Sequence, residues 1–461
     1  MEGSNADERV RLREKLGMGS LTLSINLVEQ FVSTFLLYYL TDVFGLLPAL
    51  AGVLLMLGRI WDGVNDPILG FFADNRRFRS GERVRPYALY FCGPLALMCV
   101  AMFAKVNISS TALKFTYALL VYLIFDTVCT LIRLPAYGLP MLATSDVKER
   151  ISINAYVSGA ASLGGVLASL ALWPIVRAFG GTDASGQIIN QERGFLFGSM
   201  VIGAIIIAGC LHCYFSTRER VKPIDEKEEK ISAKSALMML VKNKSWLQNS
   251  VFTLLYFSSN IVVTSSIAYY ATYVLKAPGR VTAILGAFAA GSLLILPMVS
   301  SASKRYGRRV SMVCGSSLLI LSKVVFLLNP RSLAFAAVGG LIMGMSVGFN
   351  IVLFSTNRAD LVDLLEWKHG RRIENVMSTL SGFVAKCGSS VASLMVGFGL
   401  QLTGYVAGAA EQTAGTINMI ISYQSAVPLV FGIIMLLISL KVKLDEEVAR
   451  MNAEKAAKGI S

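Results

Sequence analysis

The stretch GRIWDGVNDPILGFFADN, residues 58–75, places two aspartates and an asparagine in a segment that otherwise has the composition of a membrane helix. The apolar run LPALAGVLLML precedes it, and Asp62, Asn65 and Asp66 interrupt the apolar residues that follow. An ionised carboxylate near the centre of a bilayer costs about 2.5–3.5 kcal/mol on insertion scales. Two such carboxylates four residues apart therefore point to a functional site inside the membrane.

Apolar stretches of similar length recur along the whole chain, in which 54% of the 461 residues are hydrophobic and only 16% are charged. A soluble protein carries about 25% charged residues, and a membrane helix needs about 20 apolar ones. Twelve spans are predicted, at 17–41, 49–74, 86–105, 112–143, 153–178, 195–216, 246–275, 280–302, 309–328, 333–363, 376–404 and 420–441. The predicted fold class is an all-α, multi-pass membrane protein.

The net charge of +14 comes from basic clusters that all fall on one side of the predicted membrane. The clusters are RVRLREK, RRFRSGERVR, KER, TRERVKP, SKRYGRR, WKHGRR and the lysines after the last span. The positive-inside rule then places both termini in the cytoplasm of a cell-membrane protein. This arrangement explains the basic excess through topology and lipid contact, and no nucleic-acid partner is expected.

Two halves are predicted because a polar stretch divides the twelve spans six and six. The expected segments are a six-helix bundle at 1–215, a cytoplasmic linker at 216–245, a second six-helix bundle at 246–442 and a cytoplasmic tail at 443–461. The loops GFFADNRRFRSGERVRPY and SASKRYGRRVSMVCG occupy corresponding places in the two halves and resemble the basic signature of the major facilitator superfamily. Repeated halves with a binding site between them are common in secondary transporters. A monomer is expected.

Asp62, Asn65 and Asp66 are spaced to share one helix face, at i, i+3 and i+4. Three oxygen-bearing side chains provide what a hard cation needs in place of water. Two neighbouring carboxylates can equally share a proton, because their repulsion favours protonation of one of them. The alternative is a structural role, with Arg59 as the partner that completes a charge network.

The span 112–143 carries a second polar stripe, formed by Asp126, Thr130, Arg133 and Tyr137 at spacings of four, three and four residues. An arginine in this position is expensive and marks a candidate functional group. A buried salt bridge from Arg133 to Asp126 or Glu29 is the alternative, and Tyr137 can also be a packing residue.

The span 17–41 adds Asn26, Glu29 and Gln30, of which the two amides share a face and the glutamate lies beside it. In the span 376–404, Lys386 has no acidic residue within a turn on its own helix. Asp62 or Asp66 is therefore its predicted partner, which would link the two halves electrostatically.

The segments RIWDGVNDPILGFFADN, YYLTDVFGL and ADLVDLLEWKHGRRIENVMSTLSGFVAKCG closely resemble the glycoside–pentoside–hexuronide:cation symporters, the melibiose permease family. The resemblance covers most of the chain. It implies a twelve-helix, alternating-access transporter that imports sugars together with Na+ or H+.

Carried over residue by residue, the resemblance assigns a cation site to Asp62, Asn65, Asp66 and Thr130, with Na+ favoured, and a coupling role to Lys386. The sugar side departs from the family pattern. Asn26 and Arg133 stand where melibiose permease has sugar-binding aspartates, Tyr137 replaces a tryptophan, and an arginine is missing near 157–158. The guanidinium of Arg133 and the absence of the two aspartates favour an anionic sugar, because arginine binds carboxylates and similar anions through two hydrogen bonds. Examples are a uronate, a glucuronide or a sulfonated sugar.

The predicted substrate-binding set is completed by Glu29, Gln30 and Asp126. Two alternatives stay open: a proton-coupled symporter of a neutral glycoside, and a transporter of an amphipathic anion such as a lysolipid. An enzyme is not expected, because the sequence contains no nucleophile–histidine–acid set, metal-ligand cluster or phosphate loop. No cofactor is predicted apart from the coupling ion.

Overall fold

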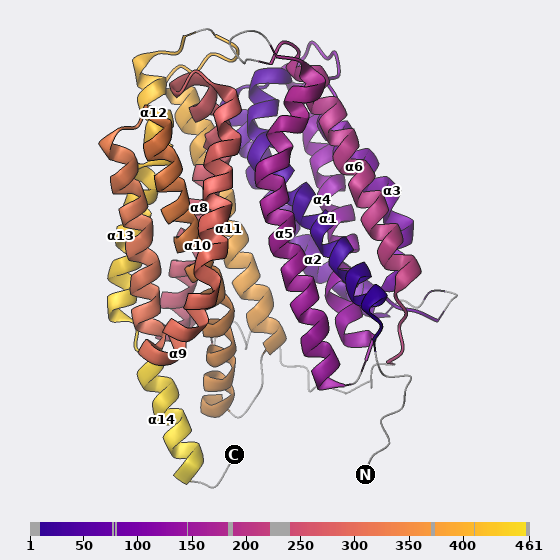
Figure 1. The fold of residues 1–461 in the computed structure, drawn as a ribbon, viewed down its shortest axis with the longest axis vertical. Helices are drawn as coiled ribbons and strands as arrows, with labels where there is room; N and C mark the ends of the chain where they lie inside the picture. The colour runs from indigo at the N-terminus through magenta and orange to yellow at the C-terminus, as the bar shows by residue number, and fades with distance from the viewer. Residues whose placement is uncertain are drawn as a thin grey trace. The chain divides into compact units, whose positions relative to one another are not determined.

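The computed structural model describes residues 10–75, 78, 81–144, 146–182, 188–221, 240–369, 374–409 and 411–457. These residues form long α-helices (Figure 1). They divide into two compact units, which we call unit 1 (Met1–Lys227 and Ala277–Thr282) and unit 2 (Glu228–Lys276 and Ala283–Ser461). The predicted linker, 216–245, lies largely outside the described residues, and the predicted segment boundaries stay predictions.

Unit 1 contains, in its described part, α1 (Leu12–Tyr38), α2 (Pro48–Asn75), α3 (Arg85–Met102), α4 (Thr111–Leu142), α5 (Val147–Gly180) and α6 (Gln191–Ser216). One π-helical turn, η1 (Tyr39–Val43), continues α1. Helix α1 packs against α5 and α6, α3 packs against α4 and α6, and α2 packs against α4 (Figure 1). The two polar helices identified in the sequence, α2 and α4, are therefore direct neighbours.

An aromatic core fixes α1 within unit 1. Phe31 and Phe35 are fully buried on α1, and they contact Phe103, Trp173 and Phe195 from the end of α3, from α5 and from α6. The rings of Phe31 and Phe103 lie 4.5 Å apart, and those of Phe35 and Trp173 lie 5.3 Å apart. Aromatic pairs at such distances stabilise by more than their buried area alone. This core holds the helix that carries Glu29 in a defined position.

Unit 2 is built around α8 (Lys244–Tyr269), which contacts four other helices of that unit. They are α10 (Leu333–His369), α11 (Glu374–Leu402), α12 (Ala414–Gln424) and α13 (Ala426–Lys441). A π-helical turn, η2 (Tyr270–Val274), extends α8. Helix α9 (Val281–Leu328) follows a short 3-10 turn, η3 (Pro278–Arg280), which belongs to unit 1.

Two of the long helical stretches are broken at defined residues. Gly307 has φ 80° and ψ 173° inside α9, a conformation that residues with a side chain rarely adopt, so α9 consists of two helical segments. This break agrees with the separate spans predicted at 280–302 and 309–328. The last predicted span, 420–441, is itself interrupted, because Ser425 has φ −132° and ψ −80° and separates α12 from α13.

Eleven candidate membrane spans meet a length and hydropathy criterion in the described residues. The predicted span 49–74 is not among them, although α2 has 28 residues. Arg59, Asp62 and Asp66 lower the hydropathy of this helix, the same feature that marks it as a functional element. The all-α membrane fold predicted from the sequence is confirmed.

The predicted tail contains a helix that the sequence analysis missed. Helix α14 (Leu444–Ala457) is polar, and its Glu447 accepts a hydrogen bond from Ser245 on α8 and pairs with Lys368 on α10, at 2.8 and 2.9 Å. Asp445 accepts hydrogen bonds from the backbone amides of Arg308 and Arg309, just after the break at Gly307. These polar contacts act together with apolar burial, because Leu444 and Met451 are buried in the hydrophobic core of unit 2.

Candidate functional site

The site lies in unit 1, where α2 and α4 approach closely. A Cβ atom added to Gly58 would lie only 1.9 Å from Cε1 of Tyr122, so a larger residue cannot occupy this position without movement of the tyrosine ring. One turn further along each helix, the close approach brings the α2 carboxylates next to the polar stripe of α4. Gly58 thus permits the contacts that define the site.

Residues from both helices meet at the predicted cation site. The hydroxyl of Thr130 donates to Asp66 Oδ1 at 2.9 Å. Asp62, Asn65 and Thr130 are buried, and Asp66 is half-buried. The structure thus joins Asp66 of α2 with Thr130 of α4, two residues of the predicted cation site.

Two local features leave polar groups available at this point of α2. The Nδ2 atom of Asn65 is buried and has no hydrogen-bond partner among the residues that the structure describes. Pro67, directly after Asp66, has no backbone N–H, so the carbonyl of Gly63 receives no hydrogen bond from that position. An unsatisfied buried amide costs about 1–3 kcal/mol, and a cation can engage this amide only through its oxygen atom, after rotation of the side chain.

Arg133 forms ion pairs with two helices at once. Its Nε and Nη2 lie 2.8 Å from Oε1 of Glu29 on α1. Its Nη1 lies 3.4 Å from Oδ1 of Asp62 on α2. Of the two partners weighed from the sequence, Glu29 is the one that the structure brings to the guanidinium, and Asp62 is an additional partner that the sequence did not indicate.

Arg59 and Asp126 complete the charged cluster. Arg59 interacts electrostatically with Tyr122, Asp62 and Asp126. Tyr122 precedes Asp126 by one helical turn, a spacing from which its place beside Arg59 could have been inferred. With Glu29, Asp66 and Arg133 included, four carboxylates face two guanidinium groups. When all six are ionised, negative charge is in excess, and the cluster attracts cations.

The predicted sugar-facing residues are only partly brought together. Tyr137 is 73% exposed and lies within electrostatic range of Glu29, Arg133 and Asp66. The side-chain amides of Asn26 and Gln30 instead donate to α1 itself, to the carbonyl of Thr22 at 2.9 Å and to the hydroxyl of Thr34 at 3.2 Å. The exposed face beside the cluster is therefore made by Tyr137 and Glu29, while the two amides are satisfied on their own helix.

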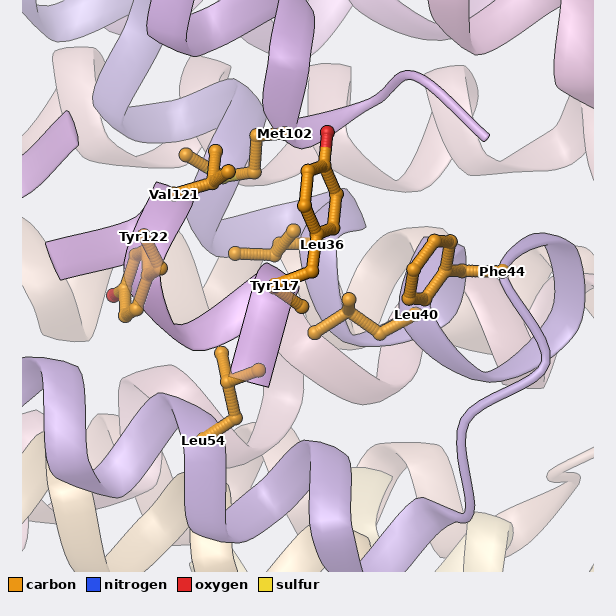
Figure 2. A pocket seen from close by; sticks show the side chains of 9 residues that line it. Leu36, Leu40, Phe44, Leu54, Met102, Tyr117, Val121 and Tyr122 are labelled. Carbon is orange, nitrogen blue, oxygen red and sulfur yellow. The ribbon is translucent and has the colours of Figure 1, made fainter. Parts of the chain in front are cut away.

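An apolar cavity adjoins the cluster but is too small for a sugar. Figure 2 shows its lining, in which Leu36, Leu40, Val121 and Tyr122 surround a space of about 10 Å³. This is close to the minimum that one water molecule requires. Tyr122 lines this cavity and also interacts with Arg59 of the charged cluster.

Lys386 lies on α11 in unit 2, half-buried, and its carbonyl accepts a hydrogen bond from Ser390 at 2.8 Å. Its predicted pairing with Asp62 or Asp66 stays a prediction.

Similarity to known proteins defines the class of transporter. The family described as MFS/sugar transport protein matches residues 17–446. The chain belongs to this family. It is therefore a multi-pass membrane transporter of the major facilitator superfamily and not an enzyme, as the sequence predicted.

Relatives and solved structures agree with this assignment. The chain is 28% identical over 423 residues to the isoprimeverose transporter of Lactiplantibacillus pentosus, covering 91% of this chain and 86% of the relative. It is 27% identical over 375 residues to a glucuronide carrier protein homolog of Escherichia coli K12, covering 81% and 80%. The resemblance to the glycoside–pentoside–hexuronide:cation symporters is thereby confirmed. The crystal structure of a bacterial homolog to the human lysosomal transporter Spinster has the same fold, with a TM-score of 0.66, 15% identity and coverage of 96% of this chain and 98% of that one.

Proposed function

We propose that this transporter imports a sugar or sugar derivative by symport with a monovalent cation, and that the cation is Na+. The site on α2 and α4 supports the proposal, since it combines two carboxylates, an amide and a hydroxyl from Asp62, Asp66, Asn65 and Thr130. A proton needs only a carboxylate, whereas Na+ requires several oxygen ligands. The contact between Thr130 and Asp66 is the observation that carries the proposal, because it places oxygen atoms from two helices at one point.

The charge of the substrate is the second part of the proposal. The sequence favoured an anionic sugar because Asn26 and Arg133 stand where the family has sugar-binding aspartates, with a salt bridge from Arg133 to Glu29 or Asp126 as the alternative. Glu29 and Asp62 supply the counter-charge of Arg133, and the cluster as a whole has an excess of carboxylates. We therefore favour a neutral sugar, whose hydroxyl groups can accept from Arg133 and donate to Glu29. An anionic sugar remains the alternative, and the similarity to a glucuronide carrier homolog supports it.

The basic clusters support a membrane orientation with both termini in the cytoplasm, which we include in the proposal. Tyr137, exposed beside Arg133, is the proposed stacking surface for the sugar ring.

The test is thermal unfolding of the purified, full-length protein with panels of sugars, in NaCl and in choline chloride. A ligand that binds only the folded protein stabilises it by about 2.7 kcal/mol at 100 times its Kd. The proposal predicts stabilisation by a neutral sugar that becomes stronger in Na+. Indifference to Na+ and Li+, together with a strong pH dependence, would favour a proton symporter. Stronger stabilisation by a uronate than by its parent hexose would favour an anionic sugar as the substrate.

A further inference from the structure

Arg133 holds a carboxylate on the proposed substrate side and another on the proposed cation side. Its Nε and Nη2 both lie 2.8 Å from Glu29 Oε1, whereas its Nη1 lies 3.4 Å from Asp62 Oδ1. The contact with Glu29 is shorter and uses two nitrogen atoms. The guanidinium is therefore anchored at Glu29, and Asp62 is its weaker attachment.

The two carboxylates differ in their freedom to move. The side chain of Asp62 is 3% exposed, and that of Glu29 is 40% exposed. Surrounding atoms hold Asp62 in place, while Glu29 has open space on one side. A change in the side-chain torsions of Glu29 can therefore carry the guanidinium away from Asp62 without breaking the shorter ion pair.

A coupling cation and a guanidinium compete for Asp62. Like charges a few ångströms apart repel strongly where solvent screening is weak, as at a buried carboxylate. The other part of the predicted cation site, Asp66 with Thr130, is held together by its own hydrogen bond at 2.9 Å. A cation that binds Asp66 and also engages Oδ1 of Asp62 would repel Nη1 of Arg133, which lies 3.4 Å from that oxygen.

We propose that Arg133 is an internal counter-ion of Asp62 that the coupling cation displaces, and that displacement frees Nη1 to donate a hydrogen bond to the substrate. The inference rests on the proposed function, since it takes Asp62 as a cation ligand. The inference supplies a coupling mechanism. The bound cation makes Nη1 of Arg133 available as a hydrogen-bond donor to the substrate, and the bound substrate in turn keeps Arg133 away from Asp62. Each ligand then raises the affinity for the other by the same factor.

Three variants separate displacement from a general effect of charge. Arg133→Met removes one of the two guanidinium groups near Asp62 and leaves Arg59 in place, so the Na+ concentration at half-saturation is expected to fall at least fivefold. Arg133→Lys keeps the charge but lacks the fork that reaches both carboxylates, so it is expected to shift in the same direction. Glu29→Gln removes the shorter ion pair of Arg133 and keeps the one to Asp62, so the half-saturating Na+ concentration is expected to rise.

The measurement is the unfolding temperature of the purified, full-length protein as the NaCl concentration is raised. Choline chloride keeps the ionic strength constant. Each titration is done without and with the sugar that stabilises the wild type in the panel described above. Lys105→Met is the matched control, because Lys105 pairs with Glu192 in the same unit at 3.2 Å, away from the cluster. Wild type and this control should show Na+ and substrate binding that enhance each other. Arg133→Met should bind Na+ more tightly, with substrate affinity no longer dependent on Na+.

Unchanged or weaker Na+ binding in Arg133→Met overturns the displacement. If Arg133→Met does not fold, Arg133→Lys with wild-type Na+ binding overturns it, as does tighter Na+ binding in Glu29→Gln. A different result would contradict the proposed function itself. In that case the unfolding temperatures of wild type and Asp62→Asn would respond identically to Na+, whatever the Arg133 variants show.

Discussion

The hydroxyl of Thr130 lies 2.9 Å from Oδ1 of Asp66, across the contact between α4 and α2. This hydrogen bond joins the stripe of α4 to the acidic face of α2. It brings together two residues of the proposed cation site that are 64 positions apart in the sequence.

Replacing Asp62 or Asp66 with Asn should abolish uphill accumulation of the substrate. The carboxylate charge that compensates the coupling ion is lost in either variant, whereas exchange driven by the substrate gradient alone can continue. Uptake by energised cells or by proteoliposomes with an imposed Na+ gradient measures the effect, and counterflow measures the residual exchange. Normal uphill uptake by both variants would rule out the cation site.

Thr130→Ala should weaken Na+ binding about tenfold or more, since a hydrogen bond to a charged group contributes about 1.5–3 kcal/mol. Thr130→Ser keeps the hydroxyl and should restore most of the affinity. Thr116→Ala is a matched control on the same helix, because the exposed Thr116 hydroxyl donates to its own helix at the carbonyl of Ala112. Titration of the unfolding temperature with NaCl compares the four proteins. An equal loss in the two alanine variants would contradict a specific role for Thr130.

The acidic face of α2 could be predicted from the sequence because it depends only on helical spacing. Asp62, Asn65 and Asp66 must share a face on any α-helix, and their polarity in an apolar segment is visible without a structure. The partner of Arg133 could not be chosen between Glu29 and Asp126 in this way. That choice depends on how α1, α2 and α4 pack, and the packing is set by contacts such as that between Gly58 and Tyr122.

The sequence analysis also missed two features outside the site. Helix α14 was missed because its apolar residues are few among charged ones, and its attachment through Glu447 and Asp445 depends on distant partners. The break at Ser425 was also missed, because the segment around it has the composition of one continuous span.

Lys386→Ala should lower the transport rate more than it lowers stability. The prediction follows from the proposed pairing of Lys386 with Asp62 or Asp66 in one phase of the transport cycle. Removing one member of a buried ion pair can cost about 3–5 kcal/mol, so the amount of folded protein must be measured in parallel. Lys276→Ala, which removes an exposed lysine of unit 2 paired with Glu411, is the control. An unchanged transport rate in well-folded Lys386→Ala would exclude the residue from the mechanism.

Lys323→Met should raise the stability of the protein. Lys323 is 3% exposed within unit 2, and among the described residues the hydrogen-bond contact of its Nζ is with the sulfur of Met343, at 3.1 Å. Burying an ammonium group without a carboxylate is unfavourable, and a thioether is a weak acceptor. Methionine has a similar length and fills the same space, so the free energy of unfolding should increase by about 1–3 kcal/mol, the usual cost of an unsatisfied buried group. Thermal unfolding of the purified protein measures the change, with Lys276→Met as the exposed control. A lower unfolding temperature in Lys323→Met than in this control would show that the amine makes a stabilising interaction in unit 2.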